Sequence, residues 1–264
     1  MSAQNWNKDA GRWVAVFLVV TAAVALGPSM IMAAGLTVGA GSGMSLGTGK
    51  LDLGCNDLVI QNGGELALDS ATIIQRHVDN QVGGTIDGGQ GSMDVYGDWT
   101  NHGTFIPGTS KVSLLDGCGL AMAYITGETT FCELLIASAM GKTVYFEAGK
   151  TQTISCSMDF TGVEGKLLVL RSSVPGSAGF VNLEEGATQH HDYENVADLV
   201  GTGQHIAPGR PSEFNSVDGG GNYRWFLNIP VPTVSQAGFA LLAMLMLFMG
   251  WRALRRSSRP AAAA

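Results

Sequence analysis

One short pattern recurs at Gly64-Glu65-Leu66-Ala67-Leu68, at Gly84-Thr85-Ile86-Asp87 and at Gly103-Thr104-Phe105-Ile106. The step between copies is roughly 20 residues, which lies within the range of repeats that form stacked coils. Further apolar segments, such as Leu58-Val59-Ile60 and Thr72-Ile73-Ile74, lie between the copies. One such coil cannot bury its own apolar face, whereas stacked coils can. The pattern therefore predicts an all-β protein, a parallel β-helix or β-solenoid.

Composition and charge narrow the range of partners. The 264 residues include 37 glycines, which fits a structure rich in tight turns. Net charge is −7, but six of the 15 basic residues lie in the terminal segments, where Asp9 is the only acid. The body thus has nine basic against 21 acidic residues, a net charge of −12. Phosphate binding needs clustered Lys and Arg, so nucleic acid is not expected as a partner.

The N-terminus has the features of an export signal. Lys8 and Arg12 precede the apolar run from Trp13 to Leu26, and small residues follow as far as Ala33-Ala34. This order is typical of a secretory signal peptide, which we assign to residues 1–34 with cleavage near Ala34. The alternative is an uncleaved membrane anchor, although the run is nearer the length of a signal core than of a membrane span.

The remaining chain divides by composition. Residues 35–49 are rich in Gly, Ser and Thr, and we expect a flexible lead there. Gly39-Ala40-Gly41-Ser42-Gly43 superficially resembles a phosphate loop but lacks a strand before it and a helix after it. Residues 50–227 form the predicted solenoid ectodomain, in which Pro208 to Asn222 is expected to be a loop. Trp225-Phe226-Leu227 is expected to close the last coil, because terminal coils need a cap.

Four cysteines lie in the predicted exported body: Cys55, Cys118, Cys132 and Cys156. An even count in an oxidising compartment favours two disulfides, and four cysteines allow three pairings. Cys118 with Cys132 is a plausible pair, because the chain between them can fold back once. Buried free thiols are the alternative. No Cys-x-x-Cys pair is present, so zinc is poorly supported and no metal is assigned.

Few residues suggest catalysis, and no catalytic residue is assigned. His190-His191-Asp192 is the one local acid–base cluster, but neighbouring strand residues point to opposite faces, so the two histidines would not converge on one ion. Asp192, Glu194 and Asp198 are candidates for the paired carboxylates of a glycosidase. Solvated acids on a strand or turn are the simpler interpretation.

Two further motifs have competing interpretations. Gly88-Gly89-Gln90-Gly91-Ser92-Met93-Asp94 nearly matches a calcium-binding β-roll repeat, although a single copy favours a polar turn between strands. Aromatic residues within the repeats could stack on sugars if exposed, or fill the interior, where alternate strand residues point. They are Tyr96, Trp99, Phe105, Tyr145, Phe146 and Phe160.

The C-terminus has the features of a membrane anchor. Residues 228–236 form a Pro-containing linker, and the uncharged apolar run that begins at Ala237 predicts a transmembrane helix over residues 237–254. Arg252, Arg255, Arg256 and Arg259 follow as a basic stop-transfer group. Residues 255–264 would form a cytoplasmic tail by the positive-inside rule, which leaves the ectodomain outside the inner membrane.

Residues around this anchor resemble a known sorting signal. The segment Val231-Pro232-Thr233-Val234-Ser235-Gln236-Ala237-Gly238, the apolar run and the arginines together resemble the IPTL-CTERM domain of Gram-negative bacteria. Pro232, Thr233, Ser235 and Gly238 match its signature, Val231 and Val234 are conservative departures, and Ala237 replaces a tryptophan. The resemblance implies sorting by an exosortase-type processing enzyme.

The body is also similar to ectodomains that such proteins carry, chiefly at Gly97-Asp98-Trp99-Thr100-Asn101-His102-Gly103-Thr104-Phe105. This resemblance implies a surface or envelope protein and no catalytic residue. We therefore expect a non-enzymatic exported protein, without cofactors, that has an adhesive or extracellular-matrix role. It would be anchored in the inner membrane with its body in the periplasm, or lie at the cell surface or be secreted after processing. Its expected partners are the membrane, the export machinery, the exosortase-type enzyme and surface glycans. The alternatives are a polysaccharide lyase or hydrolase and a carbohydrate-binding module.

Overall fold

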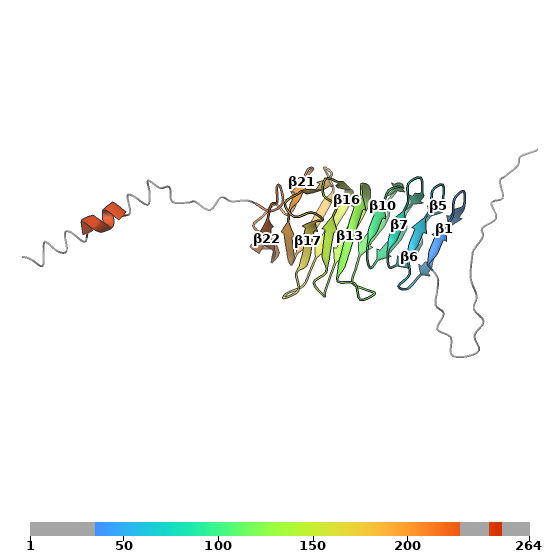
Figure 1. Ribbon diagram of the computed structural model, residues 1–264, viewed down its shortest axis with the longest axis horizontal. Helices are drawn as coiled ribbons and strands as arrows, with labels where there is room; N and C mark the ends of the chain where they lie inside the picture. The colour runs from blue at the N-terminus through green and yellow to red at the C-terminus, as the bar shows by residue number, and fades with distance from the viewer. Residues whose placement is uncertain (1–34, 228–242, 250–264) are drawn as a thin grey trace, which may run out of the picture. The chain divides into compact units, whose positions relative to one another are not determined.

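The computed structural model describes residues 35–227 and 243–249. The chain divides into two compact units, Met1–Leu227 and Asn228–Ala264. In the first unit, residues 35–227 form a parallel β-solenoid of about eight coils, with β1 in the first coil and β22 in the last (Figure 1). The fold class predicted from the repeats is confirmed.

Three sheets run along the solenoid, and every pairing between their strands is parallel. The first has nine strands: β1 (Leu36–Val38), β4 (Leu58–Ile60), β7 (Val78–Asn80), β10 (Trp99–Asn101), β13 (Met122–Gly127), β15 (Thr143–Phe146), β17 (Leu168–Ser172), β20 (Glu194–Ala197) and β22 (Val217–Gly220). The second has four: β2 (Gly43–Ser45), β5 (Glu65–Ala67), β8 (Thr85–Asp87) and β11 (Thr104–Ile106). The third contains β3 (Lys50–Asp52), β6 (Thr72–Gln75), β9 (Ser92–Val95), β12 (Lys111–Leu114), β14 (Thr129–Ala137), β16 (Thr151–Thr161), β18 (Gly179–Leu183) and β21 (Leu199–Gly201), and β19 (Thr188–Asp192) pairs with β16.

The coils change form after the fourth. Each of the first four has three short strands, and the step from Leu58 to its partner Val78 is 20 residues. From the fifth coil the second sheet ends, and single long strands, β14 and β16, follow the first-sheet strand. Their pairing shifts register between Phe131 and Glu133. This bulge bends each long strand, so that one strand covers two sides of the coil.

Alternating burial along the strands produces the core. Leu58, Ile60 and Val78 are fully buried, whereas Val59 and Asp79, the middle residues of β4 and β7, are half-buried. Most repeat aromatics fill the interior, as the second interpretation predicts: Trp99, Phe105, Phe146 and Phe160 are buried, whereas Tyr96 and Tyr145 are half-buried. Trp99 packs against Phe105 with ring centroids 5.2 Å apart.

Buried asparagines link successive coils. Asn80 Nδ2 donates to Asn101 Oδ1 at 2.8 Å and to the Thr104 carbonyl at 3.0 Å. Asn101 Nδ2 donates to Thr129 Oγ1 at 3.1 Å, which also accepts from the Trp99 indole at 3.1 Å. These bonds satisfy polar groups that would be costly to bury unpaired.

Two disulfides are present, as predicted, but the one pair that was named as plausible, Cys118 with Cys132, is not formed. Cys55 bonds Cys118 and Cys132 bonds Cys156. Cys118 and Cys132 are 14 positions apart in sequence, which is less than one coil, so these two cysteines lie at different sides of the solenoid. Cys132 and Cys156 are 24 residues apart, about one coil, and lie at the bulge between β14 and β16.

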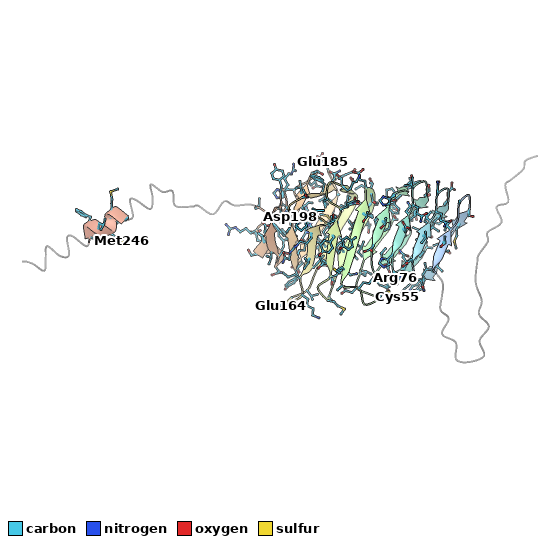
Figure 2. The ribbon with its side chains drawn as sticks, in the orientation of Figure 1. Cys55, Arg76, Glu164, Glu185, Asp198 and Met246 are labelled. Atoms are coloured by element: carbon cyan, nitrogen blue, oxygen red, sulfur yellow. A yellow bond between two sulfur atoms is a disulfide. The ribbon has the colours of Figure 1, made fainter. Side chains whose placement is uncertain are left out.

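The Cys55–Cys118 bond crosses several coils. Cys55 follows β3 of the first coil and Cys118 follows β12 of the fourth, yet their Cα atoms are 5.5 Å apart. Three coils span about 14 Å at the usual strand spacing, so the loop of residues 115–121 must run back along the solenoid. Cys55 and Arg76 mark the corner that this loop reaches (Figure 2).

Lys142 holds the start of that loop. The side chain is buried, and Nζ donates to the carbonyls of Tyr96 at 2.6 Å and Leu115 at 2.5 Å. Asp116 of the same loop accepts from Ser138 Oγ and the Ala139 amide, both at 2.8 Å. Burial lowers the pKa of Lys142 below its usual value.

The structure corrects two predicted boundaries. Residues 35–49 are not a flexible lead, because β1 and β2 pair with β4 and β5 and complete the first coil. The predicted loop from Pro208 to Asn222 contains the 3₁₀ helix η1 (Pro211–Phe214) and β22. Trp225 and Phe226 are buried at the last coil, as expected for a cap.

The predicted terminal segments fall mostly outside the described residues. The signal peptide at 1–34, the linker and sorting motif at 228–238 and the basic residues from Arg252 to Arg259 all lie outside them. Of the predicted transmembrane segment, residues 243–249 are described and are helical. Over the two described ranges, no helix has the length and apolar character needed to cross a membrane.

Candidate functional site

The histidine pair separates as strand geometry predicts. His190 and His191 lie in β19, with His190 exposed and His191 buried. His190 Nδ1 lies 3.0 Å from Asp159 Oδ1 on the outer surface. His191 points into the core, where its ring meets Phe160, Phe214 and Trp225 edge-on. The two rings therefore cannot bind one ion together.

His191 and Glu194 form a buried pair near the last coils. His191 Nδ1 lies 2.8 Å from Glu194 Oε1, and the side chains are 1% and 0% exposed. Glu194 reaches the interior because Tyr193, at φ 53°, turns the chain between β19 and β20. The Glu194 amide donates to Ser216 Oγ at 2.8 Å, which ties the pair to the segment before β22.

The hydrogen bonds around His191 determine that its ring nitrogen Nε2 carries a proton. Gln189 Oε1 accepts from the Ala207 amide at 2.8 Å, and Gln189 Nε2 donates to the His205 carbonyl at 3.0 Å. Gln189 thus presents an acceptor to His191 Nε2 at 3.1 Å, so Nε2 is the protonated nitrogen. The hydrogen bond between His191 Nδ1 and Glu194 Oε1 then needs one proton, which lies either on the imidazole nitrogen or on the carboxyl oxygen.

Burial favours placing that proton on the carboxyl group. It raises the pKa of Glu194 above the ordinary 4.5, and the neighbouring His191 opposes part of the increase. Within the described part of the chain, Glu194 Oε2 has no hydrogen-bond partner. Burial removes the water that would stabilise the charged carboxylate, and this desolvation is the physical cause of the raised pKa.

The three candidate carboxylates do not form a catalytic pair. Glu194 is enclosed in the core, whereas Asp192 accepts from Asn215 Nδ2 at 2.8 Å in an exposed contact. Asp198 lies at the corner after β20, where it accepts from the Gly176 amide at 3.0 Å. A glycosidase needs two carboxyl groups that flank one substrate bond. Glu194, without solvent access, cannot serve as one of them in this arrangement.

Other polar candidates serve the fold. Gly88 to Gly91 form the turn between β8 and β9, and Met93 of the calcium-like motif is buried. Within residues 35–227 and 243–249, no group of three or more His, Cys, Asp or Glu side chains could hold a metal. An open polar hollow lies over the later coils, lined by Asn182, Glu184, Glu185, Gly203, Gln204 and His205.

The sequence did not single out one member of an outer aromatic pair, Tyr124. Tyr124 of β13 and Tyr145 of β15 are register partners on the outer face of the first sheet. Their rings stack with centroids 4.9 Å apart and planes at 16°. Arg171 follows in the same row, and its Nη2 donates to Asn195 Oδ1 at 2.9 Å. The strand that contains Tyr124, β13, matches the repeat only weakly, so the sequence pattern did not indicate that this side chain lies opposite Tyr145.

Comparison with known proteins identifies the C-terminal region. Residues 229–256 match the model of the IPTL-CTERM motif. The match spans the predicted signature from Val231 to Gly238 together with Arg252, Arg255 and Arg256, and ends before Arg259. Searches of curated proteins and of solved structures found no match to the chain. The motif implies an exported protein with a C-terminal sorting signal.

Proposed function

We propose that this chain, which carries an IPTL-CTERM motif at residues 229–256, is a non-enzymatic cell-envelope protein with an adhesive or extracellular-matrix role. Its solenoid is exported, held at the inner membrane by the C-terminal segment, and transferred to the cell surface after an exosortase-type enzyme acts on that segment. The motif carries the proposal. Two disulfides support it, because such bonds persist in oxidising compartments outside the cytoplasm.

Mass spectrometry of the protein from envelope and secreted fractions of its native host tests this proposal. We expect an N-terminus near Gly35, two disulfides, and loss of the C-terminal segment in the surface fraction. Pro232→Ala with Thr233→Ala should leave that segment intact. Asn228→Ala, one position before the matched residues 229–256, is the control and should be processed normally.

Two results would contradict the proposal in different ways. A cytosolic protein that retains residues 1–34 would refute export. Persistence of an intact C-terminal segment in every fraction would refute processing and leave a plain membrane anchor.

Binding of surface glycans is a second candidate function, favoured by the outer Tyr124–Tyr145 stack. Aromatic faces and edges provide apolar contacts, and Arg171 and Asn195 provide polar groups in the same row of coils. Glycan-array binding by residues 35–227 should be lost in Tyr124→Ala. Tyr223→Ala is the matched control, since Tyr223 is 64% exposed and outside this row. Equal binding by both variants would refute this site.

A further inference from the structure

The two ends of the solenoid differ in how their cores are closed. At the last coil, Ile206 bridges to Trp225, and Trp225 and Phe226 are 0% and 1% exposed. No comparable cover lies over the first coil within the described residues. Within residues 35–227, the end that begins at β1 is therefore the open one.

The first coil leaves its apolar layer partly uncovered. Leu36, Met44 and Leu51 pack against the core but are only half-buried, as is Leu46. Their side chains occupy the same inward positions as residues one coil later. The register partners in that second coil are closed off almost completely: Leu58 at 0%, Leu66 at 1% and Ile73 at 0% exposure.

Backbone N–H and C=O groups at this end are also free of strand partners within residues 35–227 and can pair with an added strand. β1, β2 and β3 each pair on one side only, with β4, β5 and β6. Leu36 N donates to the Asp57 carbonyl at 2.9 Å and Leu53 N to the Ile74 carbonyl at 2.8 Å. Since alternate residues of a parallel strand pair with the same neighbour, Thr37, Lys50 and Asp52 direct their N–H and C=O groups to the open edge. Such edges are templates for added strands.

The proposed export leaves this end without its own cover. Cleavage near Ala34 would start the mature chain at Gly35, one residue before β1. The other end of the solenoid continues toward the sorting motif at residues 229–256, so the open coil is the end remote in sequence from the attachment. This step rests on the proposed function.

We propose that a second copy of this chain covers the open coil, head to head, about a twofold axis. The edge strands of the two copies then pair in antiparallel fashion, and the half-buried leucines and methionine of both first coils become one closed apolar layer. A twofold contact must be self-complementary. β3 meets this condition, because pairing centred on Leu51 sets Lys50 opposite Asp52 of the partner subunit.

Charge and accessibility support this pairing. Lys50 and Asp52 have side chains 59% and 54% exposed, and within one chain they form a long ion pair, with Nζ and Oδ2 3.8 Å apart. Pairing of two copies would exchange this contact for one between the subunits. Opposite charges across paired strands stabilise them, and like charges destabilise them. Copies attached by their other ends to two cells would thereby form homophilic bridges, and many weak bridges act together through avidity.

Purified residues 35–227 are suitable for the test, because the entire buried core from Val38 to Phe226 and both disulfides lie within them. Sedimentation equilibrium should show a concentration-dependent dimer and nothing larger. Hydrogen exchange at Thr37 and Lys50 should slow as the dimer forms. Thr37→Pro removes only an open-edge donor and should abolish the dimer without changing the circular dichroism spectrum.

A charge-swap pair gives the sharpest readout. Lys50→Asp and Asp52→Lys should each weaken self-association at least about tenfold, since each places like charges opposite one another. An equimolar mixture should restore a heterodimer. A monomer at all concentrations, a dimer indifferent to Thr37→Pro and to both swaps, or an open-ended polymer would overturn the proposal.

Failure here is distinguishable from failure of the proposed function, because the purified fragment requires neither export nor processing. The exported protein gives one more decisive comparison. A fragment that dimerises, compared with an exported protein that still carries residues before Gly35 and stays monomeric, would overturn the proposal, since those residues would then cover the open coil.

Discussion

Removal of the two disulfides one at a time should destabilise the solenoid by different amounts. The Cys55–Cys118 bond encloses a separation of 63 residues, and the Cys132–Cys156 bond encloses 24. A cross-link lowers the entropy of the unfolded chain, and the effect grows with the logarithm of the enclosed loop. The chain-entropy relation gives about 4.3 kcal/mol for the longer loop and about 3.4 kcal/mol for the shorter one.

Alanine pairs give the clean perturbation, since alanine leaves no buried hydroxyl at Cys132, which is 3% exposed. Urea unfolding of residues 35–227, followed by circular dichroism, measures the free energy of unfolding. We expect Cys55→Ala/Cys118→Ala to lose the most and Cys132→Ala/Cys156→Ala to lose about 1 kcal/mol less. Each double variant is the control for the other.

The same experiment tests the pairing and the reasoning. Cys118→Ala/Cys132→Ala breaks both bonds in this structure and should leave two titratable thiols. A Cys118–Cys132 bond in the native protein would instead leave Cys55 and Cys156 bonded to each other. A clearly smaller loss for the 63-residue loop than for the 24-residue loop would refute the entropic argument.

Three further substitutions, one of them with a matched control, should test the interior. Glu194→Gln should remove a pH dependence: because burial raises the folded-state pKa of Glu194 above 4.5, its contribution to stability is complete below that value and is lost as pH rises through the folded-state pKa. The variant should therefore gain stability relative to the parent as the pH of the urea unfolding rises above 4.5, and a constant difference would contradict this. Gly127→Ala would place Cβ 1.9 Å from the Asn101 carbonyl oxygen and should cost about 3 kcal/mol or more in thermal unfolding. Gly119→Ala, also at positive φ but in open space, should cost only about 1 kcal/mol. Asn80→Ala leaves the buried Asn101 Oδ1 without its donor and should cost about 1–3 kcal/mol by urea unfolding; a loss below about 0.5 kcal/mol would show that the Asn80–Asn101 bond contributes little.

The solenoid could be predicted because the sequence has two periodicities, one within each strand and one between successive coils. Alternation within strands selects the inward residues, and the step of 20 residues from Leu58 to Val78 stacks one coil on the next. The start of the body was misplaced for a physical reason as well. In the first coil Leu36, Met44 and Leu51 are separated by glycine-rich turns, so composition hides three short strands.

Features that depend on the path of a loop could not be predicted. The Cys55–Cys118 bond exists because residues 115–121 turn back along the stack, and no local pattern encodes that direction. The buried His191–Glu194 pair depends on Tyr193 at φ 53°, which turns an otherwise alternating segment so that Glu194 faces inward. A residue type that rarely adopts this backbone conformation gives no warning of it.

The long-range disulfide also sets how this protein would respond to tension. Strands lie across the axis on which the coils stack, so a pull between the first and last coils would peel them apart one after another. The disulfide would prevent residues 55 to 118 from extending. At about 3.4 Å per extended residue, the stretched chain would therefore be shorter by roughly 200 Å. Reducing conditions would release it, so the reach of a stretched molecule would depend on the redox state of its surroundings.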